Sequence, residues 1–68
     1  MLFWMRVKIT VKVFGISGPF EEIKVQLVNA HSEHEAKKKF EDAIHRNKSN
    51  MQAESIQFQY LEFTGTLS

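Results

Sequence analysis

The sequence predicts a small α+β domain with the element order ββαβ, in which one helix packs on one face of a three-stranded antiparallel sheet. Apolar and polar residues alternate over residues 3–14, 20–28 and 55–64, as they do in strands with one buried face. Between the second and third of these segments, residues 32–47 repeat apolar residues at helical spacing. No repeat, low-complexity tract or linker interrupts the chain, so we expect a single domain over residues 1–68.

The first predicted strand has one apolar row and one mixed row. The apolar row consists of Met5, Val7, Ile9, Val11 and Val13. The mixed row has basic residues between aromatic ones and consists of Trp4, Arg6, Lys8, Thr10, Lys12 and Phe14. Because this strand is the longest and most apolar, we expect it in the centre of the sheet, in the order 2-1-3. A right-handed crossover from the second strand over the first then brings in the third strand.

A turn joins the first two strands, since two glycines and a proline fall within residues 15–19. We expect Phe14 to lie opposite Phe20 and Lys12 opposite Glu22, because this register pairs aromatic rings and opposite charges. In that register the apolar row of the second strand faces inward. This row consists of Ile23, Val25 and Leu27.

The helix is predicted to begin with a capping box. Ser32 can accept a hydrogen bond from the amide of Glu35, and the Glu35 carboxylate can reach back to the amide of Ser32. The apolar stripe of the helix consists of Ala36, Phe40, Ala43 and Ile44.

The third strand changes its alternation part-way. Ile56, Phe58 and Tyr60 alternate with glutamines, but Leu61 and Phe63 then fall on the opposite row. Either a bulge turns these two residues inward, or the outer surface is partly apolar there. The predicted core consists of Met5, Val7, Ile9, Val11, Val13, Ile23, Val25, Leu27, Ala36, Phe40, Ala43, Ile44, Ile56, Phe58 and Tyr60.

The residue types that support catalysis or metal binding do not form a recognisable site. His31 and His34 flank the start of the helix, whereas His45 lies roughly 16 Å along it, too far to share one metal ion. The chain has no cysteine, no serine lies in a nucleophile motif, and the helix acids have lysine or arginine partners. We therefore expect no enzymatic activity, no metal or other cofactor and no small-molecule substrate.

Charge and hydropathy indicate a soluble protein. The formal net charge is +1, a weaker basic excess than nucleic-acid binders usually carry. The apolar residues 1–5 are followed at once by Arg6 and Lys8, and are too few for a signal peptide or a membrane span. We expect a cytoplasmic protein that does not contact a membrane.

The outer face of the sheet is the candidate functional site, because a single helix leaves that face uncovered. Exposed apolar clusters usually mark interfaces, and the second and third strands both present open edges. We expect a protein partner, a second copy of the chain, or both. The candidate binding residues are Trp4, Arg6, Lys8, Lys12, Phe14, Phe20, Lys24, Leu61 and Phe63.

RNA or DNA binding by the same face is the alternative, since aromatic side chains can stack on bases while cations contact phosphates. A second basic spot would support it and consists of His45, Arg46 and Lys48. The ribonucleoprotein signature sequences are absent from the chain.

Three short segments carry a resemblance to a known family. Residues 11–20 read VKVFGISGPF, the second strand ends near Asn29-Ala30, and Glu35-Ala36 opens the helix. In these segments the chain resembles archaeal ribosomal proteins of the LX type, which implies the ββαβ order and contact with ribosomal RNA. In element order and size it is also similar to small phage-encoded inhibitors of host RNA polymerase or of a host toxin, which implies a regulator of a host factor.

Overall fold

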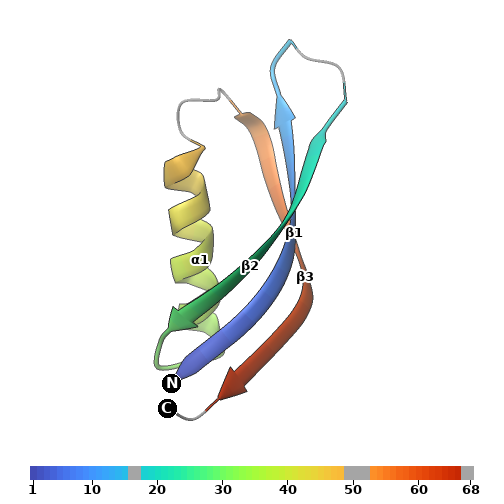
Figure 1. Cartoon of the computed structure of the whole chain (residues 1–68). Helices are drawn as coiled ribbons and strands as arrows, with labels where there is room; N and C mark the ends of the chain where they lie inside the picture. Colours follow the sequence, from blue (N-terminus) through green and yellow to red (C-terminus); the bar gives the residue numbers. More distant parts are fainter. Residues whose placement is uncertain (16–17, 49–52, 67–68) are drawn as a thin grey trace.

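The fold is a three-stranded antiparallel sheet with one helix on one of its faces (Figure 1). The computed structural model describes residues 1–15, 18–48 and 53–66, so Ile16 and Ser17 of the predicted turn lie outside the described residues. The elements are β1 (Leu2–Val13), β2 (Phe20–Asn29), α1 (Glu33–Asn47) and β3 (Ala53–Thr66). The sheet order is β2-β1-β3. The predicted α+β class, element order and strand order are confirmed.

The core forms between β1 and the apolar stripe of α1. Every second residue of β1 is buried, and these residues are Phe3, Met5, Val7, Ile9, Val11 and Val13. The buried helix residues are Ala36, Phe40 and Ile44. The ring of Phe40 lies with its centroid 6.0 Å from that of Phe58 and 6.4 Å from that of Tyr60, both in β3. The apolar stripe of the helix therefore packs against β1 and against the aromatic residues of β3.

The hairpin register differs from the predicted one. Val11 lies opposite Phe20 and Lys8 lies opposite Ile23, a shift of three residues from the expected pairing. Because side chains alternate with a period of two, an odd shift moves every side chain of β2 to the other face. The predicted inward row is thus on the outer face and is exposed. From here on, the term apolar row refers only to these three outward residues of β2, which are Ile23, Val25 and Leu27.

The physical reason lies in the width of the helix stripe. The stripe has only three buried residues, Ala36, Phe40 and Ile44. Toward β2, Phe40, Ala43 and Ile44 line a groove instead of a closed core, and on that strand Val28 packs against the core. On this side of β2, Glu22 pairs with Lys48 at 3.0 Å. At the end of the strand, the backbone carbonyl of Asn29 accepts a hydrogen bond from Lys39 Nζ at 2.9 Å. The helix side of β2 therefore carries Glu22, Lys24 and Gln26 in place of the expected aliphatic row, with Phe20 and Val28 at its two ends.

A bulge in β3 explains the slip in its alternation. Arg6 lies opposite Glu62 and the next residue, Val7, lies opposite Tyr60, so Leu61 is the extra residue. Beyond the bulge Phe63 lies opposite the buried Met5 and packs on the core side, 5.4 Å from the ring of Phe3. Of the two predicted alternatives, the bulge is the one that the structure shows for Phe63.

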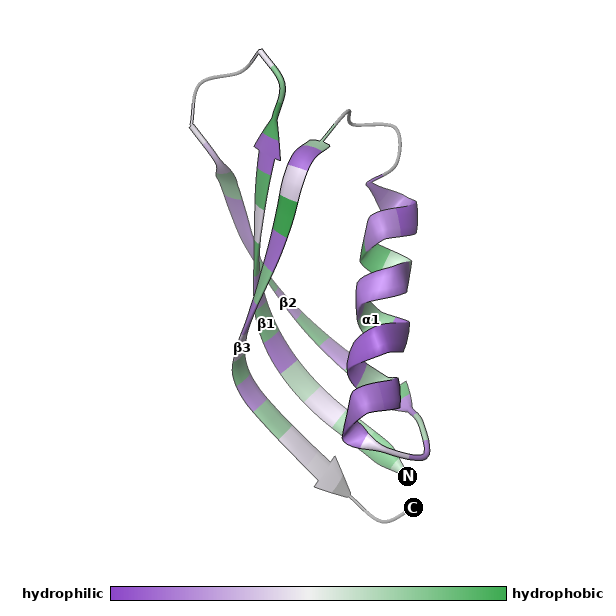
Figure 2. Ribbon diagram, turned by 180° about the vertical axis from the view of Figure 1, so that it is seen from behind, coloured by the Kyte–Doolittle hydropathy of each residue, from purple (hydrophilic) through white to green (hydrophobic). Residues whose placement is uncertain are grey.

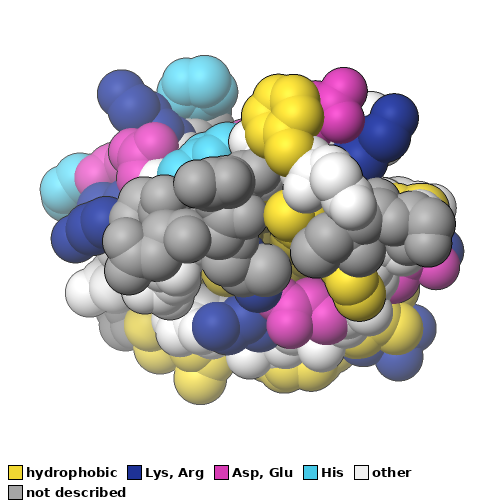
Figure 3. All heavy atoms as spheres, turned by 90° about the horizontal axis from the view of Figure 1, so that it is seen from above, with side chains coloured by type: hydrophobic (Ala, Val, Ile, Leu, Met, Phe, Trp, Pro, Cys, Tyr) yellow, Lys and Arg dark blue, Asp and Glu magenta, His cyan; other side chains and the backbone are white. Residues whose placement is uncertain are grey.

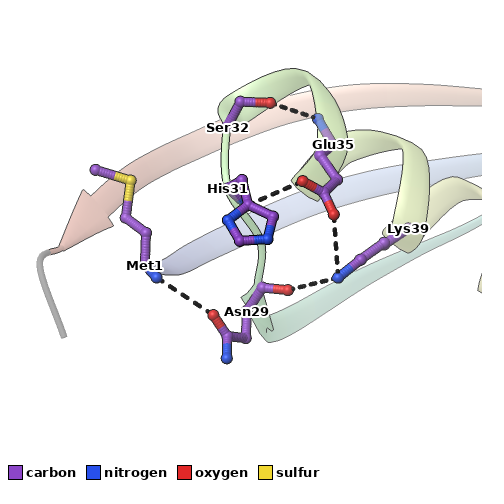
Figure 4. A network of polar contacts seen from close by, with 6 residues as sticks. All are labelled: Met1, Asn29, His31, Ser32, Glu35 and Lys39. Atoms are coloured by element: carbon purple, nitrogen blue, oxygen red, sulfur yellow. Dashed lines mark hydrogen bonds and ion pairs between the residues drawn. The ribbon is translucent and has the colours of Figure 1, made fainter.

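Hydrogen bonds at the start of α1 link the helix to the end of β2 (Figure 4). Ser32 Oγ accepts from the amide of Glu35 at 3.2 Å, as predicted. The return bond differs: Glu35 Oε2 accepts from the amide of His31 at 3.0 Å instead of that of Ser32. This bond lowers the pKa of the Glu35 carboxyl below its ordinary value, and Lys39 lowers it further. Lys39 Nζ contacts Glu35 and also the Asn29 carbonyl, so one lysine joins the helix to the sheet.

The molecule is long and narrow, with extents of 44 × 19 × 14 Å. The helix has 15 residues, which corresponds to a length of roughly 22 Å. The hairpin of β1 and β2 therefore extends past the end of the helix (Figure 1). Gly15 and Gly18 shape its tip with φ angles of 75° and 76°, which favour glycine. No helix in the described part of the chain is long and apolar enough to cross a membrane.

Candidate functional site

The outer face of the sheet combines a basic strand, an apolar strand and a polar strand. β1 contributes the outward residues Trp4, Arg6, Lys8, Thr10 and Lys12, which alternate with the buried residues. β2 contributes the apolar row beside them, with Leu27 opposite Trp4. β3 contributes Ser55, Gln57, Gln59, Glu62 and Thr64. The hydrophobic surface of this face is therefore concentrated on one edge.

The apolar row is the most exposed group of aliphatic side chains in the described residues. Ile23 is 61% exposed, Val25 is 54% exposed and Leu27 is 59% exposed. Hydrophobic and hydrophilic residues alternate along the strands, whereas most residues of the helix are hydrophilic (Figure 2). Seen from above, hydrophobic side chains lie along the side of the molecule away from the histidines, interspersed with lysine and arginine (Figure 3).

Three predicted site residues lie elsewhere than on the outer face. Lys24 lies opposite the buried Val7, and Phe20 opposite the buried Val11, so both are on the helix side of the sheet. Phe63 is on that side because of the bulge. The first two corrections follow from the hairpin register, since cross-strand neighbours point to the same face.

The two remaining apolar candidates occupy irregular positions. Phe14 follows the end of β1 and is 63% exposed, beside the hairpin tip. Leu61 is the bulged residue of β3 and is partly buried. Of the predicted apolar binding residues, Trp4 therefore lies on the outer face, whereas Phe63 lies on the helix side.

The basic residues on β1 are neutralised in part by neighbouring acids. Arg6 Nη2 lies 3.3 Å from Glu62 Oε1, and Lys8 Nζ lies 2.8 Å from Glu21 Oε2. These ion pairs are solvent-exposed and contribute only about 0–1 kcal/mol each to stability. Their main effect is on the charge of the surface, because two of the predicted phosphate-binding cations already have an anionic neighbour.

The three residues of the second basic spot, His45, Arg46 and Lys48, have different surroundings. Lys48 pairs with Glu22 of β2, and its side chain is only 20% exposed. The ring of His45 lies 5.6 Å from that of Phe58, in an edge-to-face arrangement. Arg46 is exposed near the end of α1. Among the described residues, no group of three or more histidine, aspartate or glutamate side chains is placed to hold a metal ion.

A groove runs along the helix side of β2. Its volume is about 380 Å³, and it lies between β2 and α1. The floor includes Phe40, Ala43 and Ile44, while Lys24 and Gln26 line the strand side. The edge of β2 is thus flanked by the apolar row on one face and by this groove on the other.

The apolar row was predicted in the core and lies on the outer face, as a result of the same register difference that moves Phe20 and Lys24. A strand that alternates perfectly is compatible with either orientation, so the pattern of β2 alone does not choose a face. The useful signal is the helix: its apolar stripe is too narrow to cover the inward rows of three strands. Comparison with protein family models, with curated proteins and with solved structures finds no match to this chain.

Proposed function

We propose that this chain is a non-enzymatic protein-binding module that engages its partner through the apolar row and the adjacent edge of β2. The observation that carries this proposal is the exposure of Ile23, Val25 and Leu27, each more than half accessible, in consecutive outward positions of one strand. Contiguous apolar surface on a small protein usually marks an interaction site.

Burial of this row would contribute substantially to binding. Complete burial of an aliphatic side chain contributes about 1.5–3 kcal/mol, so covering the exposed part of each residue gains roughly 1 kcal/mol or more. The free edge of β2 adds backbone hydrogen bonds, because an extended segment can pair with an unpaired strand edge. The apolar row and the edge together offer both hydrophobic contact and directional bonding.

Nucleic-acid binding has less support from the arrangement of charges. Trp4 lies on the same face as Arg6 and Lys8, but both cations pair with glutamates. Phosphate contacts predict an affinity that falls steeply with salt. Fluorescence anisotropy with labelled single-stranded RNA and DNA at low salt distinguishes the two functions: tight, salt-sensitive binding that Lys8→Glu abolishes would contradict our proposal.

A photo-crosslinking experiment tests the proposed function. A benzophenone amino acid replaces Leu27 in the apolar row, and in a control chain it replaces Lys38, an exposed residue of the helix. In cells that produce the protein, we expect irradiation to give discrete protein adducts from position 27 and none of the same mass from position 38.

A second substitution shows whether these adducts depend on the apolar row. Val25→Lys is added to the chain that carries the probe at position 27, since it places a charge in the middle of the row without removing a buried residue. We expect the adducts to disappear. Adducts that persist, or position 27 giving no more product than position 38, would overturn the proposal.

A further inference from the structure

We propose that two copies of this chain join through β2, antiparallel and with Val25 at the two-fold axis, to form a continuous six-stranded sheet. This inference rests on the proposed function, because it names a second copy as the occupant of the β2 edge. It goes further by assigning the register of the contact.

The two edges of the sheet differ in how well they can accept another strand. β3 pairs with β1 through two register irregularities, near Arg6/Val7 and Lys12/Val13, and its outward row is polar. Bulges and polar residues of this kind protect an edge from further pairing. β2 pairs with β1 without an irregularity over its 10 residues, and none of these residues is a proline. β2 is therefore the more regular edge, and the charged residues that it carries are Glu21, Glu22 and Lys24.

The apolar row is complementary to itself in one antiparallel register. A two-fold axis perpendicular to the sheet keeps both outer faces on the same side, so opposite residues must have the same parity. With Val25 opposite Val25 of the second copy, Ile23 lies opposite Leu27 of the second copy, and Leu27 opposite Ile23. Every member of the row then has an aliphatic cross-strand neighbour.

Charges on the other face of β2 are compatible with this register. Lys24 lies opposite Gln26 of the second copy, and Glu22 lies opposite Val28. Centring the pair on Lys24 instead would place two lysines directly opposite each other, which is unfavourable. Centring it on Ile23 would place Val25 opposite Glu21 and would leave Leu27 without an aliphatic neighbour. Only the Val25 register matches the whole row.

Stacking the two outer faces is less favourable than joining the edges. Face-to-face contact would remove the ion pairs Arg6–Glu62 and Lys8–Glu21 from water, and desolvation of such pairs is costly. Edge pairing leaves them solvated. It also sets two apolar rows side by side, about 4.8 Å apart, which doubles the hydrophobic patch available to another protein.

Single cysteines test the register directly, because the chain has none of its own. Val25→Cys places the two thiols in a cross-strand pair with Cα atoms about 4.5–5.5 Å apart, within disulfide range. Ile23→Cys is the matched control with similar exposure. Its two copies would be separated by four residues of strand, roughly 13 Å.

Under mild oxidation we expect Val25→Cys to form covalent dimers at least roughly tenfold faster than Ile23→Cys or Leu27→Cys alone. An equal mixture of Ile23→Cys and Leu27→Cys chains should regain the fast reaction as a heterodimer. Faster crosslinking of Ile23→Cys alone, equal rates for all three variants, or slow reaction of the mixture would overturn the proposed register.

Sedimentation velocity tests the association without a crosslink. We expect the unmodified chain to form dimers as its concentration rises, and Val25→Lys to remain monomeric with an unchanged circular dichroism spectrum. An unmodified chain that stays monomeric throughout would overturn the dimer. If position 27 still captures a foreign protein in that case, the proposed function stands without the dimer.

Discussion

Tyr60 lies where the sheet, the helix and the bulge of β3 meet. Its hydroxyl donates a hydrogen bond to Glu41 Oε2 at 2.5 Å, and Lys37 Nζ lies 4.9 Å from its ring centroid. Burial raises the pKa of the Tyr60 phenol above its ordinary value, and the hydrogen bond to Glu41 and the charge of that residue raise it further. The fold therefore stabilises the neutral phenol.

The ionisation of Tyr60 can be measured without interference, since it is the only tyrosine. We expect phenolate absorbance to appear at a higher pH in the folded chain than in urea. Because the folded pKa is the higher one, the contribution of this group to stability is complete below about pH 10 and is lost as the pH rises further. Tyr60→Phe should cost about 0.5–1.5 kcal/mol at neutral pH. An ordinary pKa in the folded chain would contradict the hydrogen bond to Glu41.

Gly65 provides a second test at the level of one residue. A Cβ atom at this position would lie 2.9 Å from Cε1 of Phe3, whose ring is buried in the core. We expect Gly65→Ala to lower the free energy of unfolding by roughly 1–3 kcal/mol, because the ring must move within a packed core. Thr64→Ala, at the exposed neighbouring position, is the control and should have little effect. Urea denaturation followed by circular dichroism gives both values.

At the level of elements, the start of α1 was well predicted because capping is local. Ser32 and Glu35 lie three residues apart in sequence and meet through one turn of helix, whatever the sheet does. The carboxylate of Glu35 then bonds to the amide of His31, one residue earlier than expected. The two amides belong to adjacent residues, so sequence spacing alone does not select between them.

The N-cap leads to a prediction for the stability of the whole fold. Ser32→Ala removes the acceptor for the Glu35 amide and should lower the free energy of unfolding by about 1 kcal/mol. Ser32→Asp is the matched control, because aspartate caps a helix as well as serine does and should preserve stability. Equal losses in the two variants would show that the hydroxyl does not act as a cap.

The strands differ in how far their pattern determines their structure. For β1 the position in the sheet and the inward residues from Met5 to Val13 were predicted, but the buried Phe3 was not included in the predicted core and Phe14 lies beyond the end of the strand. β2 could be located but not oriented, because its orientation depends on pairing with β1 and on the narrow stripe of α1. For β3 the slip at Leu61 indicated a bulge or an apolar surface, and only the pairing with β1 distinguishes them.

The candidate site shows the same difference between features of one strand, which could be predicted, and features of strand pairing, which could not. Trp4, Arg6 and Lys8 could be placed on one face from the alternation of β1 alone. Their ion pairs could not, because Glu21 and Glu62 come from the two neighbouring strands and reach them only in the actual registers. The apolar row was expected in the core because the sequence does not give the register between β1 and β2. The main candidate surface therefore became apparent only in the structure.

For the whole molecule, the single helix decides which surfaces remain free. Its 15 residues cover one face of the sheet over part of a 44 Å length, and its buried stripe contacts β1 and β3. One consequence is an elongated protein with an exposed aliphatic row on its edge strand. Both proposals, the protein-binding module and the β2-paired dimer, depend on this orientation of β2.

Nuclear Overhauser contacts of the β2 methyl groups test that orientation most directly. Opposite side chains on one face lie about 4.5–5.5 Å apart at Cβ, so we expect contacts from the Leu27 methyls to the Trp4 indole and from the Ile23 methyls to Lys8. Contacts from these methyls to the ring of Phe40 would place the apolar row beneath the helix and would contradict the account.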